Sequence, residues 1–460
     1  MRASERHASL PLGHGSQFRQ DPELTEAIDQ LYADEQLERV VDNSENLLPN
    51  RILELSEVRE LVKNEISLNG DDLNLVLSEV QKQRFYFKSI IVDVQADQSV
   101  QEIQCRRKPL IKKIEGILDE VNKMAERGET PKLELRNQRL WSNCVYDFDR
   151  VTLKSFAEAK KTSICYSDSN DRTRFSTIVF VLTKVHELLT KRLTVTRREL
   201  FYQNVARFRK QSTLDTAVRD VCCLLESPPW HLGVVATAKG LVAGPLVMVA
   251  RNGAVVDCMN SGGVLIPQDV SGIQSLRSTA RYVLVVEKDA IFQKLLDEGA
   301  LMRLGPVIII TGKGYPDVCT RQLVARLTRE LRLPALALVD ADPHGLEIYL
   351  TYKYGSLAQS HLSHDLSCGK LRLLGARHAD AVTLAPAAAR LPLTARDRRK
   401  IQSLMRRPYL DAPACAPLRA ELRAMLASGV KAELEAVAPT ASELCDAYIP
   451  AKLRQLRVKT

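Results

Sequence analysis

The sequence predicts a mixed α/β protein of two or three domains, and three observations support this. Its 460 residues exceed the size of one ordinary domain. After Gln274, apolar runs of strand length alternate with helical patterns. Before Gln274, helical patterns are followed by two short strands joined through Asn-Gly. We therefore expect a domain of helices with a hairpin, followed by a domain with a small parallel sheet.

Composition and charge narrow the class of protein. Apolar residues make up 45%, and no run of about 18 apolar residues occurs, so no membrane span or membrane partner is expected. The N-terminus lacks a secretory apolar stretch, which favours an intracellular protein. Ten scattered cysteines without Cys-x-x-Cys spacing predict reduced, mostly buried thiols. The first 140 residues hold 20 Lys and Arg against 26 Asp and Glu, whereas the remainder holds 45 against 30. A basic body suits a polyanion partner such as DNA, although an uneven soluble surface would give the same count.

The N-terminal part is expected to lack chemistry of its own. Residues 1–20 have the composition of a disordered tail. Residues 21–140 are interpreted as an acidic helical extension, because helical spacing recurs over Ile111–Met124 and a break follows at Gly128–Pro131. Contacts with partner proteins are its expected role.

Residues 141–273 are interpreted as a winged helix-turn-helix (CAP-like) domain, a shape that docks on DNA. Apolar residues from Ile178 to Leu189 form one helical face. Thr196 and Glu199 fit a capping box that begins a second helix, and Val218–Leu225 lies in a third. Two strands then follow, at Leu246–Ala250 and Ala254–Asp257.

Residues 274–460 are expected to form a small parallel sheet covered by helices, with a C-terminal helical extension. Strands and helices alternate in this order: Arg281–Val286, Ile291–Met302, Pro306–Ile310, Val318–Leu331, Ala335–Val339 and Gly345–Tyr354. Such sheets place functional groups at the carboxyl ends of their strands. From Ser367 the chain is rich in Ala and Leu, with basic clusters around Arg398 and Arg406, and is expected to pack helically on the sheet.

Three acids follow the predicted strands. Glu287 ends the first strand, and Asp340 and Asp342 follow the third. Asp340 and Asp342 would lie about 7 Å apart, so their repulsion would cost about 2–3 kcal/mol at an effective dielectric of ~20. A divalent cation relieves such repulsion, and oxygen ligands select Mg²⁺ or Mn²⁺ over zinc. The alternative is that these acids cap the helices that follow. Calcium-loop and phosphate-loop spacings both fail here.

Tyr202 ends the stretch Thr196–Tyr202, and Arg198 precedes it by one helical turn. A guanidinium beside a phenol would favour the nucleophilic phenolate, whose formation is otherwise opposed by a pKa near 10. Core packing is the alternative role for a tyrosine on such a helix. Spacing alone does not select one of the 12 tyrosines.

These residues lie in stretches that resemble the meiotic double-strand-break transesterases, eukaryotic relatives of the topoisomerase VI A protein. The resemblance covers roughly residues 170–460 in one order. It rests on the stretches Thr196–Tyr202, Val286–Ala290, Ile310–Gly314, Val339–Gly345 and Tyr352–Ser356. About 140–170 residues at the N-terminus do not align; in the family this region usually contacts the accessory subunit.

The resemblance implies a winged-helix domain joined to a Toprim domain that holds Mg²⁺. It implies that Tyr202 is the nucleophile, that Arg198 supports it, and that Glu287, Asp340 and Asp342 bind the metal. The family tyrosine attacks a phosphate of double-stranded DNA, leaving a 5′-phosphotyrosyl link and a free 3′ hydroxyl.

The resemblance also implies a homodimer with shared active sites, other meiotic factors, an accessory subunit like the topoisomerase VI B protein, and a nuclear location. Lys288, Lys313 and Lys353, next to the motifs, could hold DNA phosphates. Two alternatives stay open. One is a true A protein of the topoisomerase VI type that works with an ATPase, and the other is a winged-helix DNA-binding protein without catalysis.

Overall fold

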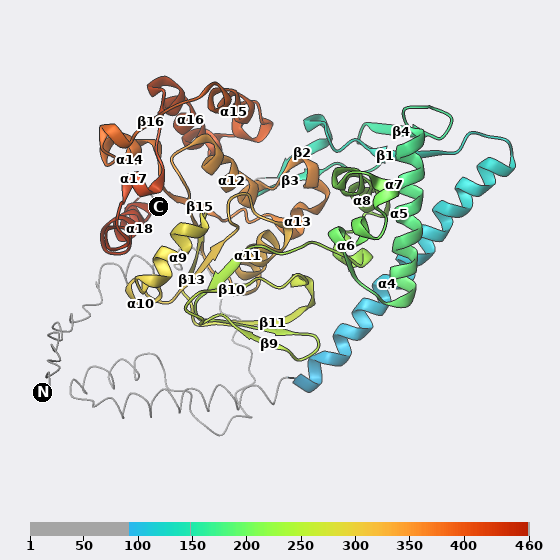
Figure 1. The fold of residues 1–460 in the computed structure, drawn as a ribbon, viewed down its shortest axis with the longest axis horizontal. Helices are drawn as coiled ribbons and strands as arrows, with labels where there is room; N and C mark the ends of the chain where they lie inside the picture. The colour runs from blue at the N-terminus through green and yellow to red at the C-terminus, as the bar shows by residue number, and fades with distance from the viewer. Residues whose placement is uncertain (1–91, 148, 459–460) are drawn as a thin grey trace, which may run out of the picture.

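The computed structural model describes residues 92–147 and 149–458. The predicted disordered tail and most of the predicted acidic extension lie outside these residues. Within them, helices and short strands of the N-terminal half form one lobe, and a six-stranded sheet with its helices forms the other (Figure 1). No helix in the described ranges is long and apolar enough to cross a membrane.

The N-terminal lobe is held together by one aliphatic core. Its long helices are α4 (Val92–Glu126), α5 (Arg172–Lys191) and α8 (Gln211–Leu225). In α5, Ile178, Val181 and Val185 recur at helical spacing and are fully buried, as predicted. Strand β1 (Lys132–Arg136) pairs antiparallel with β4 (Lys161–Cys165) in this lobe. A second antiparallel pair, β2 (Cys144–Asp147) with β3 (Arg150–Leu153), packs against the other lobe, where Val151 belongs to the core.

The short helix α6 (Arg197–Tyr202) follows directly from a two-residue strand. That strand, β5 (Val195–Thr196), pairs with β6 (Val234–Val235). The predicted capping box is confirmed, because the Glu199 amide donates to the Thr196 hydroxyl at 3.1 Å and the Glu199 carboxylate accepts from the Thr196 amide. Leu200 is buried under the helix, and α7 (Val205–Phe208) comes next.

The second lobe contains the predicted parallel sheet, extended by further strands. Parallel pairing joins β12 to both β13 and β14, and β14 to β15. The full strand order is β10 (Val264–Leu265), β7 (Leu241–Ala243), β13 (Val307–Thr311), β12 (Tyr282–Val286), β14 (Ala335–Leu338) and β15 (Arg372–Gly375). Strand β12 is central, and all five of its residues are buried.

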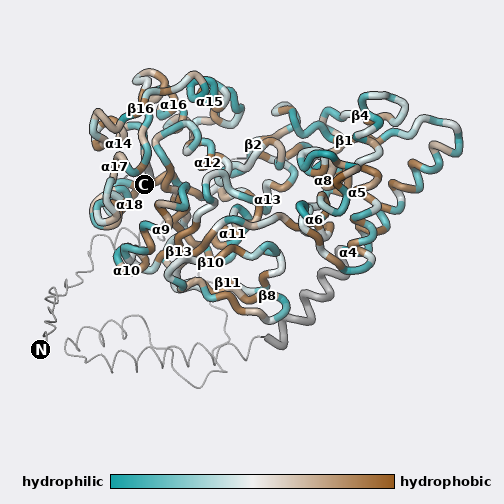
Figure 2. The backbone as a smooth tube through the Cα atoms, in the orientation of Figure 1, coloured by the Kyte–Doolittle hydropathy of each residue, from teal (hydrophilic) through white to brown (hydrophobic). Residues whose placement is uncertain are grey.

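Helices cover both faces of this sheet, which explains the continuous apolar runs of its strands. Along β12, Val283 and Val285 belong to one core, whereas Leu284 and Val286 belong to the other. The first core includes residues of α11 (Val318–Glu330), α12 (Pro343–Tyr354), α15 (Ala395–Met405) and α16 (Ala416–Ser428). The second includes residues of α9 (Asp289–Asp297), α14 (His378–Thr383), α17 (Leu434–Val437) and α18 (Ile449–Val458). In Figure 2, the chain around β11 and β13 is coloured hydrophobic, whereas much of α15 is hydrophilic.

Two details of the sheet domain differ from the prediction. The helix predicted over Ile291–Met302 is divided into α9 and α10 (Ala300–Arg303), because Gly299 adopts φ +70° between them. The segment after Ser367 was predicted to be helical, but it first supplies β15 to the sheet. Short elements complete the lobe: α13 (Ser363–Leu366), β16 (Leu391–Pro392) and β17 (Val430–Lys431).

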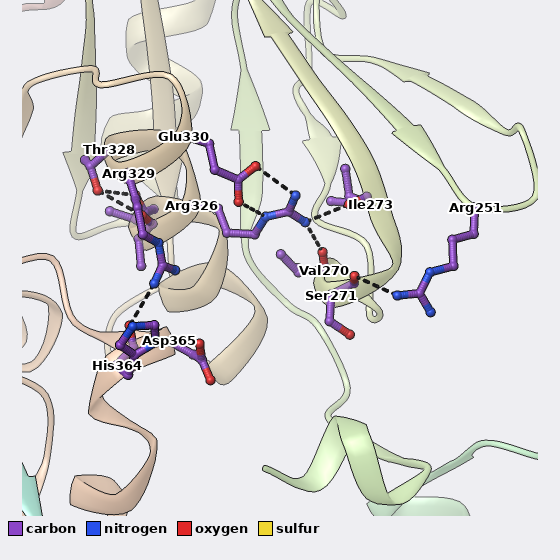
Figure 3. A network of polar contacts seen from close by, with 12 residues as sticks. Arg251, Val270, Ser271, Ile273, Arg326, Thr328, Arg329, Glu330, His364 and Asp365 are labelled. Carbon is purple, nitrogen blue, oxygen red and sulfur yellow. Dashed lines mark hydrogen bonds and ion pairs between the residues drawn. The ribbon is translucent and has the colours of Figure 1, made fainter. Parts of the chain in front are cut away.

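The predicted hairpin forms, but it packs with the sheet domain. Strands β8 (Leu246–Ala250) and β9 (Val255–Asp257) pair as expected, and β11 (Ile273–Ser278) adds a third strand. Met248 and Leu276 share a core with Val283. Arg326 of α11 donates to the carbonyls of Val270 and Ile273, which fixes this small sheet to the larger one (Figure 3). The winged-helix assignment of residues 141–273 therefore stays a prediction.

The cysteines agree with the expectation of reduced thiols. Every cysteine whose side chain the structure describes is free, and all but Cys144 and Cys165 are buried.

Shortening a buried side chain of the central strand β12 should destabilise the fold. We expect Leu284→Ala, which removes a fully buried side chain, to lower the free energy of unfolding by about 2–5 kcal/mol. Leu193→Ala, at a leucine that is 54% exposed, is the control and should change it by less than about 0.5 kcal/mol. Denaturant titrations followed by circular dichroism would measure both. Equal losses in the two variants would contradict the assignment of β12 to the core.

Candidate active site

The three predicted acids meet at the carboxyl edge of the parallel sheet. Glu287 directly follows β12, and Asp340 and Asp342 lie just beyond the end of β14. Because β12 and β14 are parallel neighbours, with Val286 opposite Leu338, their following residues emerge side by side. The sequence prediction of a shared edge is thus confirmed by the register.

Glu287 is tied to both neighbouring strand ends. Its side chain accepts a hydrogen bond from the Asp340 amide at 2.9 Å, and its backbone carbonyl accepts from Gly314 at 2.8 Å. A Cβ on Gly345 would lie 2.5 Å from the Asp340 carbonyl oxygen and 3.0 Å from the Glu287 carboxylate. The first turn of α12 therefore approaches the acids as closely as only glycine allows.

Both aspartates already have hydrogen-bond donors. Asp340 accepts from the Leu434 amide at 2.9 Å and lies 3.2 Å from the Lys288 ammonium nitrogen. Asp342 is the N-cap of α12 and accepts from the Gly345 amide at 2.6 Å. Helix capping, the alternative weighed against metal binding, is therefore present at Asp342.

Two of the carboxyls at this edge have raised pKa values. Burial, followed by the charge of Asp340, raises the pKa of Glu287 to about 8. Burial also raises the pKa of Asp340 to about 6, although the Leu434 amide and Lys288 oppose the shift. A bound cation would remove this penalty, and carboxylate oxygens are ligands that Mg²⁺ and Mn²⁺ accept.

The carboxylates are not arranged as a ready metal site. Within the described residues, no three His, Cys, Asp or Glu side chains converge on one point as metal ligands would. The side chains of Asp340 and Asp342 point to backbone amides and, for Asp340, to Lys288. The donor types fit a hard divalent cation, and binding one would require these side chains to exchange their present partners.

Tyr202 is more exposed than the other tyrosines that the structure describes. Its side chain is 70% exposed at the end of α6, whereas Tyr166 and Tyr315 are 45% and 44% exposed. Core packing, the alternative role for this residue, is therefore excluded. Arg198 is also exposed, but within the described chain no hydrogen bond or cation–π contact joins it to Tyr202. The closest aromatic neighbour is Phe201, whose ring centroid is 5.6 Å away.

The tyrosine and the acids lie in different lobes. In Figure 1, α6 is grouped with α5 and α8, whereas α9 and α12, which begin beside the acids, lie in the other half of the molecule. Among the described residues, no hydrogen bond or ring contact joins Tyr202 to any of the three acids.

The three lysines next to the motifs have different surroundings. Lys353 is half-buried and donates to the carbonyls of Gly369 and Leu371, which makes it a structural residue and not a phosphate ligand. Lys313 pairs with Asp289 at 3.0 Å near the surface. Lys288 pairs with Asp340.

A second polar cluster beside the acids has no sequence signal. Glu347 of α12 accepts from Lys400 of α15 at 2.6 Å and from Arg407 and Tyr315. The Tyr315 hydroxyl also lies 3.1 Å from Nδ1 of His344, which follows the Asp-x-Asp pair. The cluster joins the loop after β13 to α12 and α15. Only the tertiary structure identifies it, because Glu347 resembles any helical glutamate in the sequence.

Comparisons with known families match both lobes. The family that describes the Toprim domain of Spo11 and of the topoisomerase 6 A protein matches residues 282–453, and "Type IIB DNA topoisomerase" matches residues 173–234. The first range contains the sheet edge with its three acids, and the second contains α6 and Tyr202. The mixed α/β lobe with the parallel sheet is a Toprim domain.

Curated relatives extend the match over most of the chain. The human "Meiotic recombination protein SPO11" is 36% identical over 345 residues, which cover 74% of this chain and 86% of the relative. The Drosophila melanogaster "Meiotic recombination protein W68" is 36% identical over 73% of this chain and 99% of the relative. The A protein of DNA topoisomerase 6 from Arabidopsis thaliana is 34% identical over 69% and 74%.

The raised pKa of Glu287 predicts that the fold loses stability as the pH rises. Between its ordinary value of 4.5 and about 8, the folded state binds more protons at Glu287 than the unfolded state does. The folded state therefore loses stability as pH rises through this window. In metal-free buffer, Glu287→Gln should reduce the fall in melting temperature between about pH 5 and pH 8 by on the order of 5 °C. Glu120→Gln, at an exposed residue of α4, is the control. An identical fall in melting temperature in wild type, Glu287→Gln and Glu120→Gln would refute the prediction.

Proposed function

Because the chain belongs to the family of Spo11 proteins and topoisomerase VI A proteins, we propose that it makes the DNA double-strand breaks of meiotic recombination. It is a topoisomerase-like DNA transesterase. The observation that carries this function is the combination of a freely exposed Tyr202 with three acids at a Toprim sheet edge. The named meiotic relatives favour break formation over the other functions of the family.

The proposed reaction exchanges one phosphodiester for another. The Tyr202 oxygen forms a bond to a backbone phosphorus, and the bond between that phosphorus and the 3′ oxygen breaks. The proton of the phenol ends on the released 3′ hydroxyl, and the 5′ phosphate stays attached to Tyr202. The exposed phenol can reach a phosphate without any rearrangement of its helix, and Arg198 on the same exposed side would favour the anionic oxygen.

Glu287, Asp340 and Asp342 would hold Mg²⁺, with Mn²⁺ as a substitute. Bound there, the ion would neutralise charge on the phosphate that reacts. The chain itself contributes a rigid frame for this site. Strand β12 is buried on both faces, and Gly345 fixes the start of α12 against Glu287.

The site is proposed to form between two subunits. Tyr202 and the acids lie in different lobes, so a homodimer on DNA would bring the tyrosine of each subunit to the acids of its partner (Figure 1). Two such sites cut the two strands. Further proposed partners are other meiotic factors and an accessory subunit like the topoisomerase VI B protein, and the proposed location is the nucleus.

The domain roles follow from this reaction. We assign DNA binding and the nucleophile to residues 141–273 as a winged-helix domain, and metal binding to residues 274–460. The acidic segment 21–140, of which residues 92–140 with α4 and β1 are described, would contact the accessory subunit.

An A protein of the topoisomerase VI type is the second candidate, supported by the 34% identity to the Arabidopsis protein. The same tyrosine and acids would serve it. Relaxation of supercoiled DNA with an ATPase subunit would establish it, whereas breaks that are not resealed would exclude it. Binding of DNA without catalysis is disfavoured, because a non-catalytic protein has no need for a tyrosine that is 70% exposed or for the raised pKa values of Glu287 and Asp340.

Replacing the nucleophile should abolish covalent attachment to DNA. We expect Tyr202→Phe to reduce covalent protein–DNA complexes recovered from meiotic cells by at least about a hundredfold, since phenylalanine has no oxygen to form the ester. The control is Tyr166→Phe, at the next most exposed of the described tyrosines, which should leave their yield unchanged. Persistence of the complexes in the Tyr202→Phe protein would show that another residue attacks.

A mixed dimer tests whether the site is shared. Chains with Tyr202→Phe paired with chains with Asp340→Asn contain one complete shared site, but no complete site within a single chain. We therefore expect this dimer to nick DNA without cutting both strands. Asn is chosen because Asp340 also accepts from Leu434, and an amide oxygen keeps that bond. Absence of nicks, with both parent dimers folded, would favour a site within one chain.

The exposed arginines of α15 are expected to contact the DNA backbone. Arg396, Arg398 and Arg399 are exposed, whereas Lys400 and Arg407 are already bound by Glu347. Neutralising the three arginines to Gln should weaken DNA binding about 10- to 100-fold for any sequence and reduce the salt slope by about 2–3. The control replaces Lys108, Lys112 and Lys123, three exposed lysines of α4, with Gln. Filter binding at several salt concentrations measures both the affinity and its salt slope. Equal effects of the arginine and lysine variants would contradict a contact between α15 and DNA.

A further inference from the structure

The ammonium group of Lys288 is surrounded by three carboxylates. Its Nζ lies 3.2 Å from Asp340, 3.1 Å from Glu433 and 3.0 Å from Glu435. The Lys288 side chain is 28% exposed and that of Asp340 is 9% exposed. Lys288 therefore supplies positive charge to one of the proposed metal ligands at a partly dehydrated site, where charge interactions are strong.

The two glutamates are held beside Asp340 by the backbone and not by the lysine. Ala341 and Ala432 exchange two backbone hydrogen bonds, of 3.0 and 3.2 Å. The Leu434 amide, between the two glutamates in the sequence, donates to Asp340. The segment from Ala432 to Glu435 thus stays against the sheet edge wherever the lysine points.

The position of Lys288 conflicts with metal binding at Asp340. Its ammonium lies at hydrogen-bond distance from Asp340 Oδ2, and Oδ1 is taken by the Leu434 amide. A cation that binds Asp340 must displace one of these donors. The amide belongs to a segment fixed by two further hydrogen bonds, whereas the lysine has a flexible four-carbon side chain.

We propose that Lys288 is a built-in counter-cation that competes with the divalent metal for Asp340, and that Glu433 and Glu435 retain its ammonium group when the metal binds. This inference rests on the proposed function, since it assumes that Asp340 is a metal ligand. Lys288 neutralises the acids in the metal-free protein. When the metal displaces the ammonium from Asp340, the two glutamates remain paired with it. Lys288 therefore leaves Asp340 without becoming an unpaired charge.

A permanent ion pair is the alternative. In that case Lys288 would stay on Asp340 whether or not metal is bound, and Glu433 and Glu435 would act only by their negative charge. The two possibilities differ in how the lysine and the glutamates depend on each other, which a double-mutant cycle measures.

The test is calorimetric titration of MgCl₂ into the full-length chain without DNA. Four proteins are compared: wild type, Lys288→Met, Glu433→Gln with Glu435→Gln, and the triple variant. We expect Lys288→Met to bind Mg²⁺ about tenfold more tightly, because the competing charge is gone, and the double Gln variant to bind about tenfold more weakly. In the Lys288→Met background the same two Gln changes should weaken binding by about threefold or less, because no ammonium remains to be retained.

Lys313→Met is the matched control. It removes a neighbouring lysine that pairs with Asp289 at 3.0 Å and contacts none of the three acids. Its Mg²⁺ affinity should stay within about threefold of wild type. Equal effects of Lys288→Met and Lys313→Met would overturn the competition, because any nearby charge would then suffice.

Thermal stability in chelator and in Mg²⁺ gives a second readout. Lys288→Met should lower the melting temperature in chelator and regain it as Mg²⁺ is added, since the ion replaces the lost charge. If wild type binds Mg²⁺ but Lys288→Met has unchanged affinity, the inference fails and the metal site stands. If wild type binds no Mg²⁺ and Lys288→Met melts as wild type does, both the metal site and the inference fail.

Discussion

The repulsion among three carboxylates at one sheet edge is the constraint on which the site depends. Parallel strands that end together bring Glu287, Asp340 and Asp342 close, and burial makes the charges of Glu287 and Asp340 costly. The protein offsets this cost with donors from three different segments: the Asp340 amide, the Gly345 amide and the Leu434 amide. Each donor fixes a piece of backbone, so the charge of the acids also determines how α12 and α17 meet the sheet.

The same edge is reinforced from the side away from α17. Glu347 lies two residues beyond Gly345 in α12 and contacts Lys400, Arg407 and Tyr315. These partners come from α15, from the residues after it and from the loop after β13, so they hold the helix that carries Asp342 as its N-cap. A site whose supporting residues are themselves fixed loses little entropy when it binds a metal or a phosphate.

The proposed nucleophile, in contrast to the acids, lies on the surface. Tyr202 ends a six-residue helix and lies on the surface with few contacts of its own, while the capping box and Leu200 hold the helix in place. If the proposed site is shared between two subunits, activity would depend on assembly with DNA and a second copy of the chain, and an isolated chain would not cleave DNA.

The sequence alone determined the alternation of strands and helices after Gln274, the capping box at Thr196, and the strand-end positions of Glu287, Asp340 and Asp342. Local periodicity and strand-end position are short-range properties, so they can be read without a structure. The family resemblance supplied the choice among 12 tyrosines, which spacing could not make and exposure later supported.

Only the tertiary structure decided which groups surround those residues. Lys288 meets Glu433 and Glu435 across about 145 residues of sequence, and Lys353 is directed into the protein and not to a phosphate. The hairpin that resembles a wing in the sequence packs on the sheet domain, because its inward side chains share a core with β12. Such contacts join segments far apart in the chain. Their energies depend on packing and charge in three dimensions, and no local pattern encodes them.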